Sequence, residues 1–375
     1  MKTRKKLHIL LIIGMINSLP LWSQVLQEED TSFNTTRFSG MAGAVSAIPL
    51  NLENLLYNPA GLATKLKDRS QNATFSLAID TYFKPQYLFP ILRNSSTIQN
   101  AKDLITSSGA GTSGTFAFGL TPINSKWGFG VYGGSTIYLQ GKPFPFGTEG
   151  YINFSVNFPF AYSFIMSQSN KHILSFGTMI HPEIAIIKTL NGKDVDALAG
   201  GTVTIGELVK NVINTPVYSF PVDMGIIYVS YDNPYENAEF RFSFVIKNFF
   251  NSYYDKNGKN PTIKKRFEMT PGIAYVLPFK IFKMNCTGIL SAEIDGLNLV
   301  VEETENFWKS LKLGAELNIS NFLFIQAGLA SGYPAIGAEL RILDLFFGFS
   351  FETVEKGVYI GDNPLSVFRI SLSLR

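Results

Sequence analysis

The residues of this chain that could do acid, base or metal chemistry are few and widely spaced. Beyond residue 23 the histidines are His172 and His181, and no metal-ligand spacing accompanies either of them. The run His181-Pro182-Glu183 joins a base to a carboxylate, as a hydrolytic site would, but no serine stands out as its nucleophile. No helix follows the glycines of 128–134, so they form no phosphate-binding loop. The sequence therefore predicts no catalytic residue, no metal site and no cofactor.

Composition excludes a nucleic-acid partner and favours apolar strands. The formal net charge is +3, and four of the basic residues lie within the first six positions, so the rest of the chain is close to neutral. It lacks the basic face that nucleic acids require. Apolar residues make up 46% of the chain and charged residues 16%, against a typical charged share of about 25%. The single cysteine, Cys286, has no partner for an internal disulfide and is interpreted as a small apolar strand residue.

Residues 1–23 have the pattern of a secretory signal peptide. A basic start from Lys2 to Lys6 precedes the apolar run Ile9 to Ile13. This run is too short and too interrupted to span a bilayer as a helix, and we place cleavage after Ser23. A retained membrane anchor is the alternative, because Leu21 is unusual at the third position before the cut. The mature chain is therefore expected to be exported.

The end of the chain shows the clearest strand pattern. Apolar residues occupy every second position from Phe368 to Leu374, with arginine or serine between them. Successive side chains of a strand point to opposite faces, so one face is apolar and the other polar. Leu311–Ile319 and Phe240–Ile246 alternate in the same way. This period, bounded by turn residues, predicts fourteen strands, near 72–82, 113–121, 126–138, 151–166, 171–187, 217–231, 238–249, 265–277, 284–296, 308–319, 321–329, 334–341, 343–352 and 365–375.

The connections between these strands alternate in length. Those after even strands are short, whereas those after odd strands are longer, except for 330–333. Outer-membrane barrels have an even strand number, short periplasmic turns and longer external loops. A soluble sandwich has no reason to keep this parity, and a propeller would show a repeat of about 40–50 residues, which is missing. We therefore predict an all-β fold, a closed antiparallel transmembrane β-barrel of about 14 strands over 67–375, in the cell outer membrane.

An N-terminal hatch is predicted at 24–66, ahead of the first strand. About eight strands already suffice to pack a small barrel, so a wider barrel must be open or plugged. Gly40 and Gly43 permit close approach of the backbone, and Asn58-Pro59-Ala60-Gly61 predicts a tight turn. A compact, turn-rich segment before a wide barrel is a natural plug inside the lumen.

At these residues the chain resembles the FadL-like outer-membrane transporters of long-chain fatty acids and other hydrophobic compounds. Members of this family carry a hatch with an Asn-Pro-Ala motif, matched by Asn58, Pro59 and Ala60, after a glycine-alanine-rich stretch, matched by 40–44. The family barrel has fourteen strands. The closing strands, with 312–316 and 335–340, resemble those of the related PorV-like branch, which implies a binding or shuttle role in protein secretion. Arg375 departs from the terminal aromatic residue of outer-membrane proteins, and we carry over no ligand-contacting residue.

Prolines and glycines gather in one sector of the predicted wall. They lie at Gly133, Gly134, Pro159, Pro182 and Pro221, in the third to sixth strands. These residue types mark places where strands break or bulge. We interpret them either as a lateral gate, through which a hydrophobic ligand leaves sideways into lipid, or as ordinary bulges that bend a large barrel.

Two long connections show helical spacing with an apolar stripe, at 94–108 and 207–214. Each is either a cap packed on its own loop or an external platform that collects apolar ligands.

Two functions from different classes remain. The first is passive transport of hydrophobic compounds such as fatty acids, with outer-membrane lipid and hydrophobic small molecules as partners. The second is a PorV-like binding or shuttle protein that holds a secretion partner protein. A greasy lumen would favour the first function, and a polar, fully plugged lumen the second. A plain diffusion porin is weaker, because the hatch would obstruct it.

Overall fold

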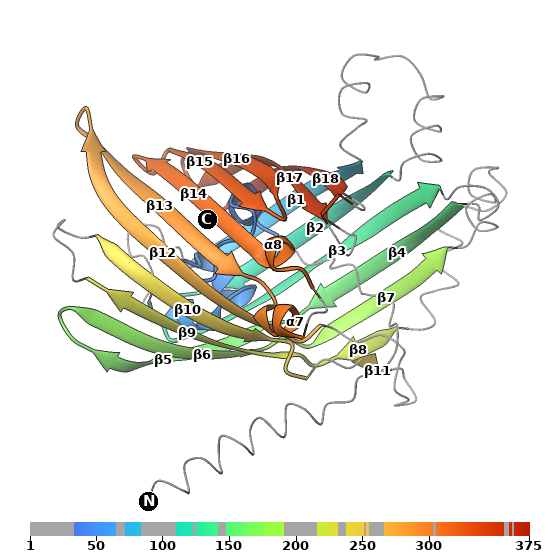
Figure 1. Ribbon diagram of the computed structural model, residues 1–375, viewed down its shortest axis with the longest axis horizontal. Helices are drawn as coiled ribbons and strands as arrows, with labels where there is room; N and C mark the ends of the chain where they lie inside the picture. The colour runs from blue at the N-terminus through green and yellow to red at the C-terminus, as the bar shows by residue number, and fades with distance from the viewer. Residues whose placement is uncertain are drawn as a thin grey trace, which may run out of the picture.

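The computed structural model describes most of the chain beyond residue 33. The described residues are 34–64, 72–83, 110–122, 125–141, 148–190, 216–231, 238–250, 253–254, 266–302, 305–355, 360–361 and 364–375. The signal peptide predicted at 1–23 and the loop helices predicted at 94–108 and 207–214 lie outside these residues. The described strands form one antiparallel sheet that closes on itself, because β18 pairs with β1 along its length (Figure 1).

The sheet contains eighteen strand segments but fourteen transmembrane strands. Four strands are each divided into two segments by a short interruption: β4 with β5, β6 with β7, β8 with β9, and β10 with β11. The segments are β1 (Ala73–Phe83), β2 (Ala110–Leu120), β3 (Trp127–Gly141), β4 (Thr148–Asn157), β5 (Phe160–Gln168), β6 (His172–Ile180), β7 (Glu183–Leu190), β8 (Val217–Ser219), β9 (Val222–Ser230), β10 (Glu239–Lys247), β11 (Tyr253–Tyr254), β12 (Glu268–Ile281), β13 (Met284–Ile294), β14 (Leu311–Ile319), β15 (Leu323–Ala330), β16 (Tyr333–Ile342), β17 (Leu345–Glu355) and β18 (Pro364–Leu374). The predicted fold class is therefore confirmed.

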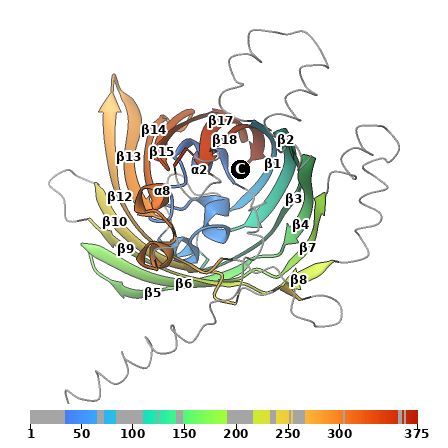
Figure 2. The same ribbon diagram turned by 45° about the vertical axis from the view of Figure 1, so that its right-hand side comes forward.

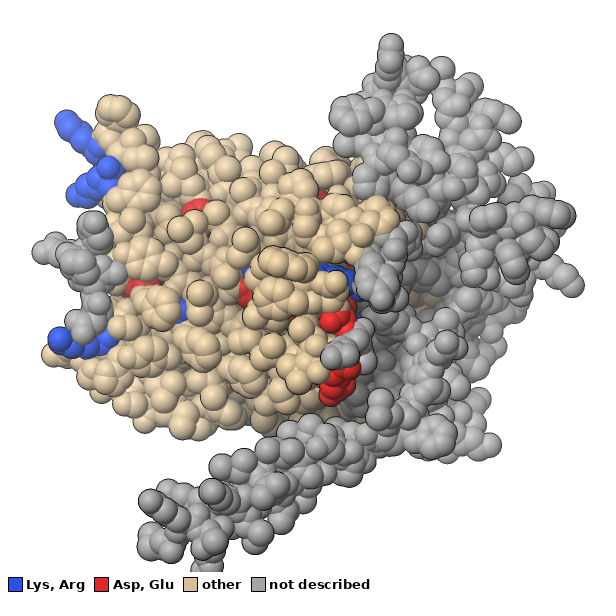
Figure 3. All heavy atoms as spheres, in the orientation of Figure 1, with Lys and Arg blue, Asp and Glu red and all other residues tan. Residues whose placement is uncertain are grey.

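The two faces of the wall follow the predicted alternation. In β18, Phe368 and Ile370 are exposed on the outer face, whereas Arg369 and Ser371 are buried on the inner face. The same pattern in β14 buries Glu316 and Asn318 inside. The outer surface in Figure 3 is accordingly almost free of charged side chains between its two ends. A closed barrel with this arrangement satisfies its backbone groups within the wall and presents apolar side chains to lipid.

The connections keep the predicted difference between the two ends of the barrel. Short turns join β2 to β3, β5 to β6, β12 to β13, β14 to β15 and β16 to β17. The opposite end carries the long connections and the short helices α7 (Leu297–Val301) and α8 (Phe307–Ser310). Outer-membrane barrels show the same difference between their periplasmic turns and their external loops.

The inside of the barrel holds residues 34–64, called here the plug segment (Figure 2). It consists of α2 (Thr36–Gly40), η1 (Asn51–Leu55) and η2 (Pro59–Leu62), and nearly all of its side chains are buried. The Thr35 hydroxyl caps α2 by accepting from the Phe38 amide, and the Asn58 side chain caps η2 in the same way. The helix α2 contacts β15 to β18, whereas η2 contacts β5, β6 and β9 across the lumen. None of the described helices is long and apolar enough to cross a membrane.

Candidate functional site

The Asn58-Pro59-Ala60 turn of the plug segment rests on two glycines of the wall. Gly177 of β6 and Gly225 of β9 lie directly opposite each other in the ladder. A Cβ atom on Gly177 would stand 2.3 Å from the Ala60 nitrogen, and one on Gly225 would stand 2.0 Å from the Asn58 Oδ1 atom. No side chain fits between wall and turn at either position. We call this pair the glycine seat.

Few polar contacts hold the turn on the glycine seat. The Ser175 hydroxyl donates to the Ala60 carbonyl at 3.1 Å. The remaining contacts are apolar: Ala60 packs against Ile227 and Val229, and the neighbouring Leu55 and Leu62 pack against Ala161 and Met179. Within the turn, Asn58 Oδ1 accepts from the Ala60 amide, and the Asn58 side-chain amide donates to the Ser46 carbonyl at 2.8 Å. Hydrogen bonds of the Asn58 side chain fix the turn internally. Close van der Waals packing against the wall holds it in place.

The glycine seat lies beside the interrupted sector of the wall, which we define as the four divided strands. The interruptions fall at Phe158-Pro159, His181-Pro182, Phe220-Pro221 and between Lys247 and Tyr253. Proline has no amide hydrogen to donate to the ladder, which accounts for a break at the first three positions. The gate predicted from Pro159, Pro182 and Pro221 therefore maps to three strand interruptions. Whether the wall opens there is a proposal taken up below.

The wall is closed across the interrupted sector in this structure. Four backbone hydrogen bonds bridge it: Gly130 to Pro159, Phe158 to Pro182, His181 to Pro221, and Phe249 to Val222, each from amide to carbonyl at 2.9–3.1 Å. Large aromatic side chains at three of the breaks (Phe158, Phe220, Phe249) are exposed on the outer surface. These four hydrogen bonds hold the wall at the breaks, whereas continuous ladders pair the strand segments on either side of them.

A buried pair joins two of the interruptions. The His181 Nε2 atom lies 3.3 Å from a carboxylate oxygen of Asp223, and both side chains are buried. The other oxygen of Asp223 accepts from the Asn248 amide at 2.7 Å. Asp223 thus connects the break after β6 to the break after β10. The sequence drew attention to the run His181-Pro182-Glu183 but did not reveal Asp223 as the partner of His181.

The predicted break at Gly133 and Gly134 is wrong. The strand β3 continues through both glycines and pairs with β2 on one side and β4 on the other. A Cβ on Gly133 would stand 2.3 Å from the Ser155 carbonyl oxygen, and one on Gly134 would stand 2.7 Å from the Gly114 carbonyl oxygen. These glycines therefore allow close approach of neighbouring strands. The interrupted sector begins at the fourth strand.

Glycines of the predicted hatch motif also allow close approach. A Cβ on Gly40 would stand 2.9 Å from the Gly337 Cα atom of β16, so α2 lies directly against the wall. Gly43 has a φ of +86°, a conformation that suits glycine and ends the turn after α2. A Cβ on Gly61 would stand 2.1 Å from the Asn54 Oδ1 atom, so the glycine allows η1 and η2 to pack this closely.

Charged groups hold the opposite side of the plug segment. Arg37 of α2 donates to Glu316 of β14 at 2.7 Å and forms a second ion pair with Glu53 of η1. Arg369 of β18 forms two hydrogen bonds with Asp80 of β1 and also donates to the Ser39 hydroxyl at 2.7 Å. All of these side chains are buried. We call this the anchored side, because its ion pairs contrast with the apolar contacts at the glycine seat.

Replacing Arg37 with methionine is expected to destabilise the barrel by about 3–5 kcal/mol. The change leaves Glu53 and Glu316 buried without their cation, and an uncompensated buried charge is strongly destabilising. Urea unfolding of the detergent-refolded protein measures the effect. The matched variant Arg37→Met/Glu316→Gln is expected to recover part of the loss. A loss below about 1 kcal/mol for Arg37→Met would contradict a structural role for this pair.

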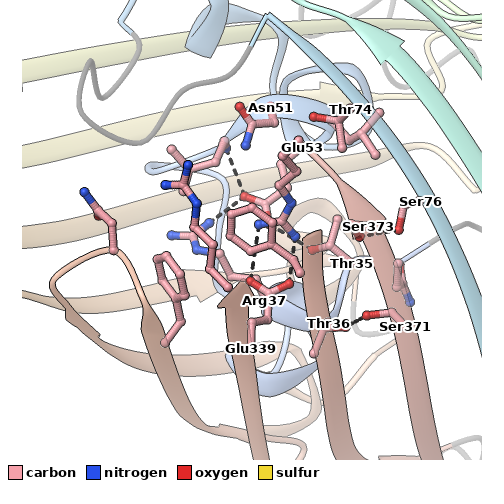
Figure 4. A pocket seen from close by; sticks show the side chains of 18 residues that line it. Thr35, Thr36, Arg37, Asn51, Glu53, Thr74, Ser76, Glu339, Ser371 and Ser373 are labelled. Carbon is pink, nitrogen blue, oxygen red and sulfur yellow. Dashed lines mark hydrogen bonds and ion pairs between the residues drawn. The ribbon is translucent and has the colours of Figure 1, made fainter. Parts of the chain in front are cut away.

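A small polar cavity lies below the plug segment at the short-turn end. Its volume is about 40 Å³, and it lies between plug residues and inward residues of β1, β16 and β18. Figure 4 shows Arg37, Glu53, Ser76, Glu339 and Ser373 around it. This space is enough for a few water molecules but not for a hydrocarbon. The cavity gives a hydrophobic ligand no through route past the plug segment.

A second charged cluster lies above the plug segment, at the long-loop end. Asp295, one residue beyond β13, contacts the Nζ atoms of Lys312 at 2.5 Å and Lys247 at 3.6 Å. Burial alone would raise the pKa of Asp295, but the two ammonium groups outweigh it and hold that pKa well below its usual range. Nearby, Glu293 accepts from the Ser46 amide at 3.0 Å. These contacts connect three strands to one another and to the plug segment.

The described residues show no grouping of side chains suited to a metal ion. No three His, Cys, Asp or Glu side chains of the described chain gather at one point. His172 is the first residue of β6, where its ring hydrogen-bonds the Ser169 hydroxyl at 2.9 Å and stacks on Tyr228. The β5–β6 turn accounts for the first contact, and the pairing of β6 with β9 accounts for the second.

Comparisons with known proteins give a likeness of fold. No family model matches the chain, and no curated protein matches it. It is similar to a deltaS2 mutant of the TodX monoaromatic hydrocarbon channel, at 11% identity and a TM-score of 0.46, over 91% of this chain and 98% of that one. It is similar to the toluene transporter TbuX of Ralstonia pickettii, at 12% identity and a TM-score of 0.45, over 92% and 98%.

A third solved structure, CdiB from Acinetobacter baumannii, is similar at 11% identity and a TM-score of 0.39 over 81% of this chain, which spans 60% of CdiB's length. TodX and TbuX are FadL-family hydrocarbon channels, the family that the hatch motif resembles. Identities of 11–12% and TM-scores of 0.45–0.46 carry no argument about what this chain binds.

Replacing Gly177 with alanine is expected to lift the Asn58-Pro59-Ala60 turn off the glycine seat. Overpacking of this kind costs about 1–3 kcal/mol, and the shifted turn should also raise the ionic leak through the barrel. Thermal unfolding and planar-bilayer conductance measure the two effects. Gly114→Ala is the matched control, because a Cβ there has nothing within 4 Å. Equal stability and equal leak for the two variants would remove the glycine seat as a plug contact.

Proposed function

We propose that this barrel is a passive outer-membrane transporter of hydrophobic compounds, with fatty acids or other apolar molecules as its substrates. The observation that carries the proposal is the position of the Asn58-Pro59-Ala60 turn, which rests beside the only interrupted sector among the described strands. Displacement of the turn frees the inner surface of this sector. An apolar ligand then reaches lipid through the wall without crossing the polar cavity at the short-turn end.

The predicted hatch is part of this proposal. In the described range 34–64, the plug segment fills the cross-section between β14 to β18 on one side and β5, β6 and β9 on the other. We propose that it pivots on the anchored side, because the ion pair between Arg37 and Glu316 is costly to break. The apolar contacts at the glycine seat separate with a smaller penalty. Motion of this kind needs no nucleotide, which makes the transport passive.

The barrel itself supports the outer membrane as the location of this activity. Apolar side chains cover its outer face, and its long and short connections lie at opposite ends. The TodX and TbuX structures are those of an aromatic hydrocarbon channel and a toluene transporter. We include small aromatic hydrocarbons among the apolar molecules proposed as substrates.

The experiment that tests the proposal is uptake of radiolabelled toluene and oleate by cells that express the full chain. Both probes are expected to enter faster than in cells without it, whereas a labelled disaccharide should not. An unchanged rate for both apolar probes, with the folded barrel present in the outer membrane, would contradict transport. Folded barrel is measured by its heat-modifiable mobility on gels.

A second candidate function is a PorV-like binding or shuttle protein that acts in protein secretion. The observation in its favour is the polar inner wall around the plug segment, where buried inward positions include Ser243, Glu316, Glu339 and Ser371. A lumen of this kind offers little apolar surface to a passing ligand. Under this alternative, uptake of toluene and oleate stays at the background rate.

A further inference from the structure

The rim at the short-turn end carries exposed lysines. Lys126, Lys171, Lys280 and Lys283 lie in or next to three of its turns, and all four are exposed. Among the described residues of this rim, Asp344 is the exposed acidic side chain. Figure 3 shows the result as Lys and Arg atoms along the left edge of the molecule, where the β12–β13 and β5–β6 turns lie in Figure 1. The described part of this rim therefore has a positive surface.

The hairpin of β12 and β13 keeps an apolar outer face up to its apex. On the outer face of β12, Leu277, Phe279 and Ile281 follow one another at every second position toward the turn, and Met284 begins β13. At the apex, Phe282 is 93% exposed. A turn that lies in water beyond the membrane would not need an apolar outer face. The outer surface suited to lipid thus extends to the apex itself.

Backbone conformation gives a second reason to assign a role to the apex. Phe282 and Lys283 have φ values of +45° and +74°. Two-residue turns with positive φ favour Asn and Gly, and a bulky side chain there is strained. Leu343, in the β16–β17 turn on the same rim, has a φ of +58° and is 86% exposed. Neither side chain contributes burial that would stabilise the fold, so both are positioned for a contact outside the chain.

We propose that this rim binds anionic phospholipid headgroups of the periplasmic leaflet. The apolar apices at Phe282 and Leu343 enter the interface between headgroups and acyl chains, where aromatic side chains and snorkelling lysines are both favoured. The ammonium group of Lys283, in the turn beside Phe282, contacts lipid phosphates. The charge of the rim selects anionic lipids, and its apolar apices favour lipid over a soluble acidic partner. This proposal requires only that the barrel spans a bilayer, so its failure leaves the transport proposal intact.

Fluorescence quenching by labelled lipids tests the proposal. Phe282→Cys in a Cys286→Ala background is labelled with bimane, and the full chain is reconstituted into phosphatidylcholine vesicles. The vesicles contain a small fraction of doxyl-labelled phosphatidylglycerol or of doxyl-labelled phosphatidylcholine. Quenching by the anionic lipid is expected to exceed quenching by the zwitterionic lipid about fivefold. This ratio corresponds to the free energy that one lysine contributes to binding at an anionic lipid surface. High salt should reduce the difference.

Variants of Lys283 separate charge from a change in folding. Adding Lys283→Gln should bring the two quenching values together, whereas Lys283→Arg should preserve the difference. Equal quenching by both lipids in the labelled parent would overturn the selection of anionic headgroups. If aqueous iodide quenches the label and neither lipid does, the apex lies in water and the proposal is overturned. The apex would then be available to bind a periplasmic protein.

Discussion

Deletion of residues 24–66 is expected to convert a nearly silent barrel into a conducting pore. The described part of this segment lies inside the barrel and contacts the wall on both sides, and a ring of fourteen strands is too wide for its own side chains to fill. The inward side chains of the strands are largely polar, so the lumen takes up water once the segment is removed. Planar-bilayer recordings of the refolded proteins measure the change, from rare openings to the steady conductance of an open pore.

The deletion should disturb the wall less than the single change Arg37→Met. Once the whole segment is removed, Glu316 is no longer buried, because water fills the space around it and replaces Arg37 as its partner. Heat-modifiable mobility provides the control that the shortened chain still folds. A full-length chain with large conductance that the deletion leaves unchanged would show that the segment does not block the barrel.

The barrel was predictable because membrane and lumen impose one strict pattern on each strand. Every second residue faces lipid, so the alternation of apolar and polar residues is enough to predict strands such as β14 and β18. The pattern is weaker in the interrupted sector, where prolines divide the strands. There the sequence predicted one continuous strand from 151 to 166, and the structure has β4 and β5. Proline marks such a break locally, so this detail was accessible from the sequence.

Glycine carries no comparable local meaning. Gly133 and Gly134 were interpreted as a break, but they allow close packing of neighbouring strands. Gly177 and Gly225 were passed over, although they form the glycine seat. Their role depends on the register between β6 and β9, which places them opposite each other. An isolated glycine inside a predicted strand was the signal that could have suggested a close approach by another part of the backbone.

The anchored side was also beyond the reach of local patterns. Arg37 and Glu316 are separated by 279 positions, and only closure of the barrel brings β14 to the plug segment. The hatch motif identified the turn at Asn58, Pro59 and Ala60, but not the wall that it faces. The contrast between an ion-paired side and an apolar side emerges only when both contacts are placed on one ring of strands. This contrast is the basis of the proposed pivot.

A disulfide between the plug segment and β10 is expected to stop uptake of apolar probes. The hydroxyls of Ser46 and Ser243 lie 2.9 Å apart, so cysteines at these positions place their sulfur atoms close to each other for oxidation to a disulfide. The carbonyl of Ser46 accepts from the Asn58 side chain, so fixing Ser46 also holds the turn on the glycine seat. In a Cys286→Ala background, oxidised Ser46→Cys/Ser243→Cys should take up toluene at the background rate, and a reductant should restore uptake.

A second disulfide distinguishes a pivot from release of the whole segment. The hydroxyls of Thr36 and Ser371 lie 2.5 Å apart on the anchored side. Because a pivot leaves this side in place, oxidised Thr36→Cys/Ser371→Cys should retain most of its uptake. Loss of uptake with both disulfides would show that the whole segment must leave the wall. A mobility shift on non-reducing gels confirms that the Ser46→Cys/Ser243→Cys pair is oxidised. Full uptake by this oxidised variant would show that ligands pass without displacing the turn.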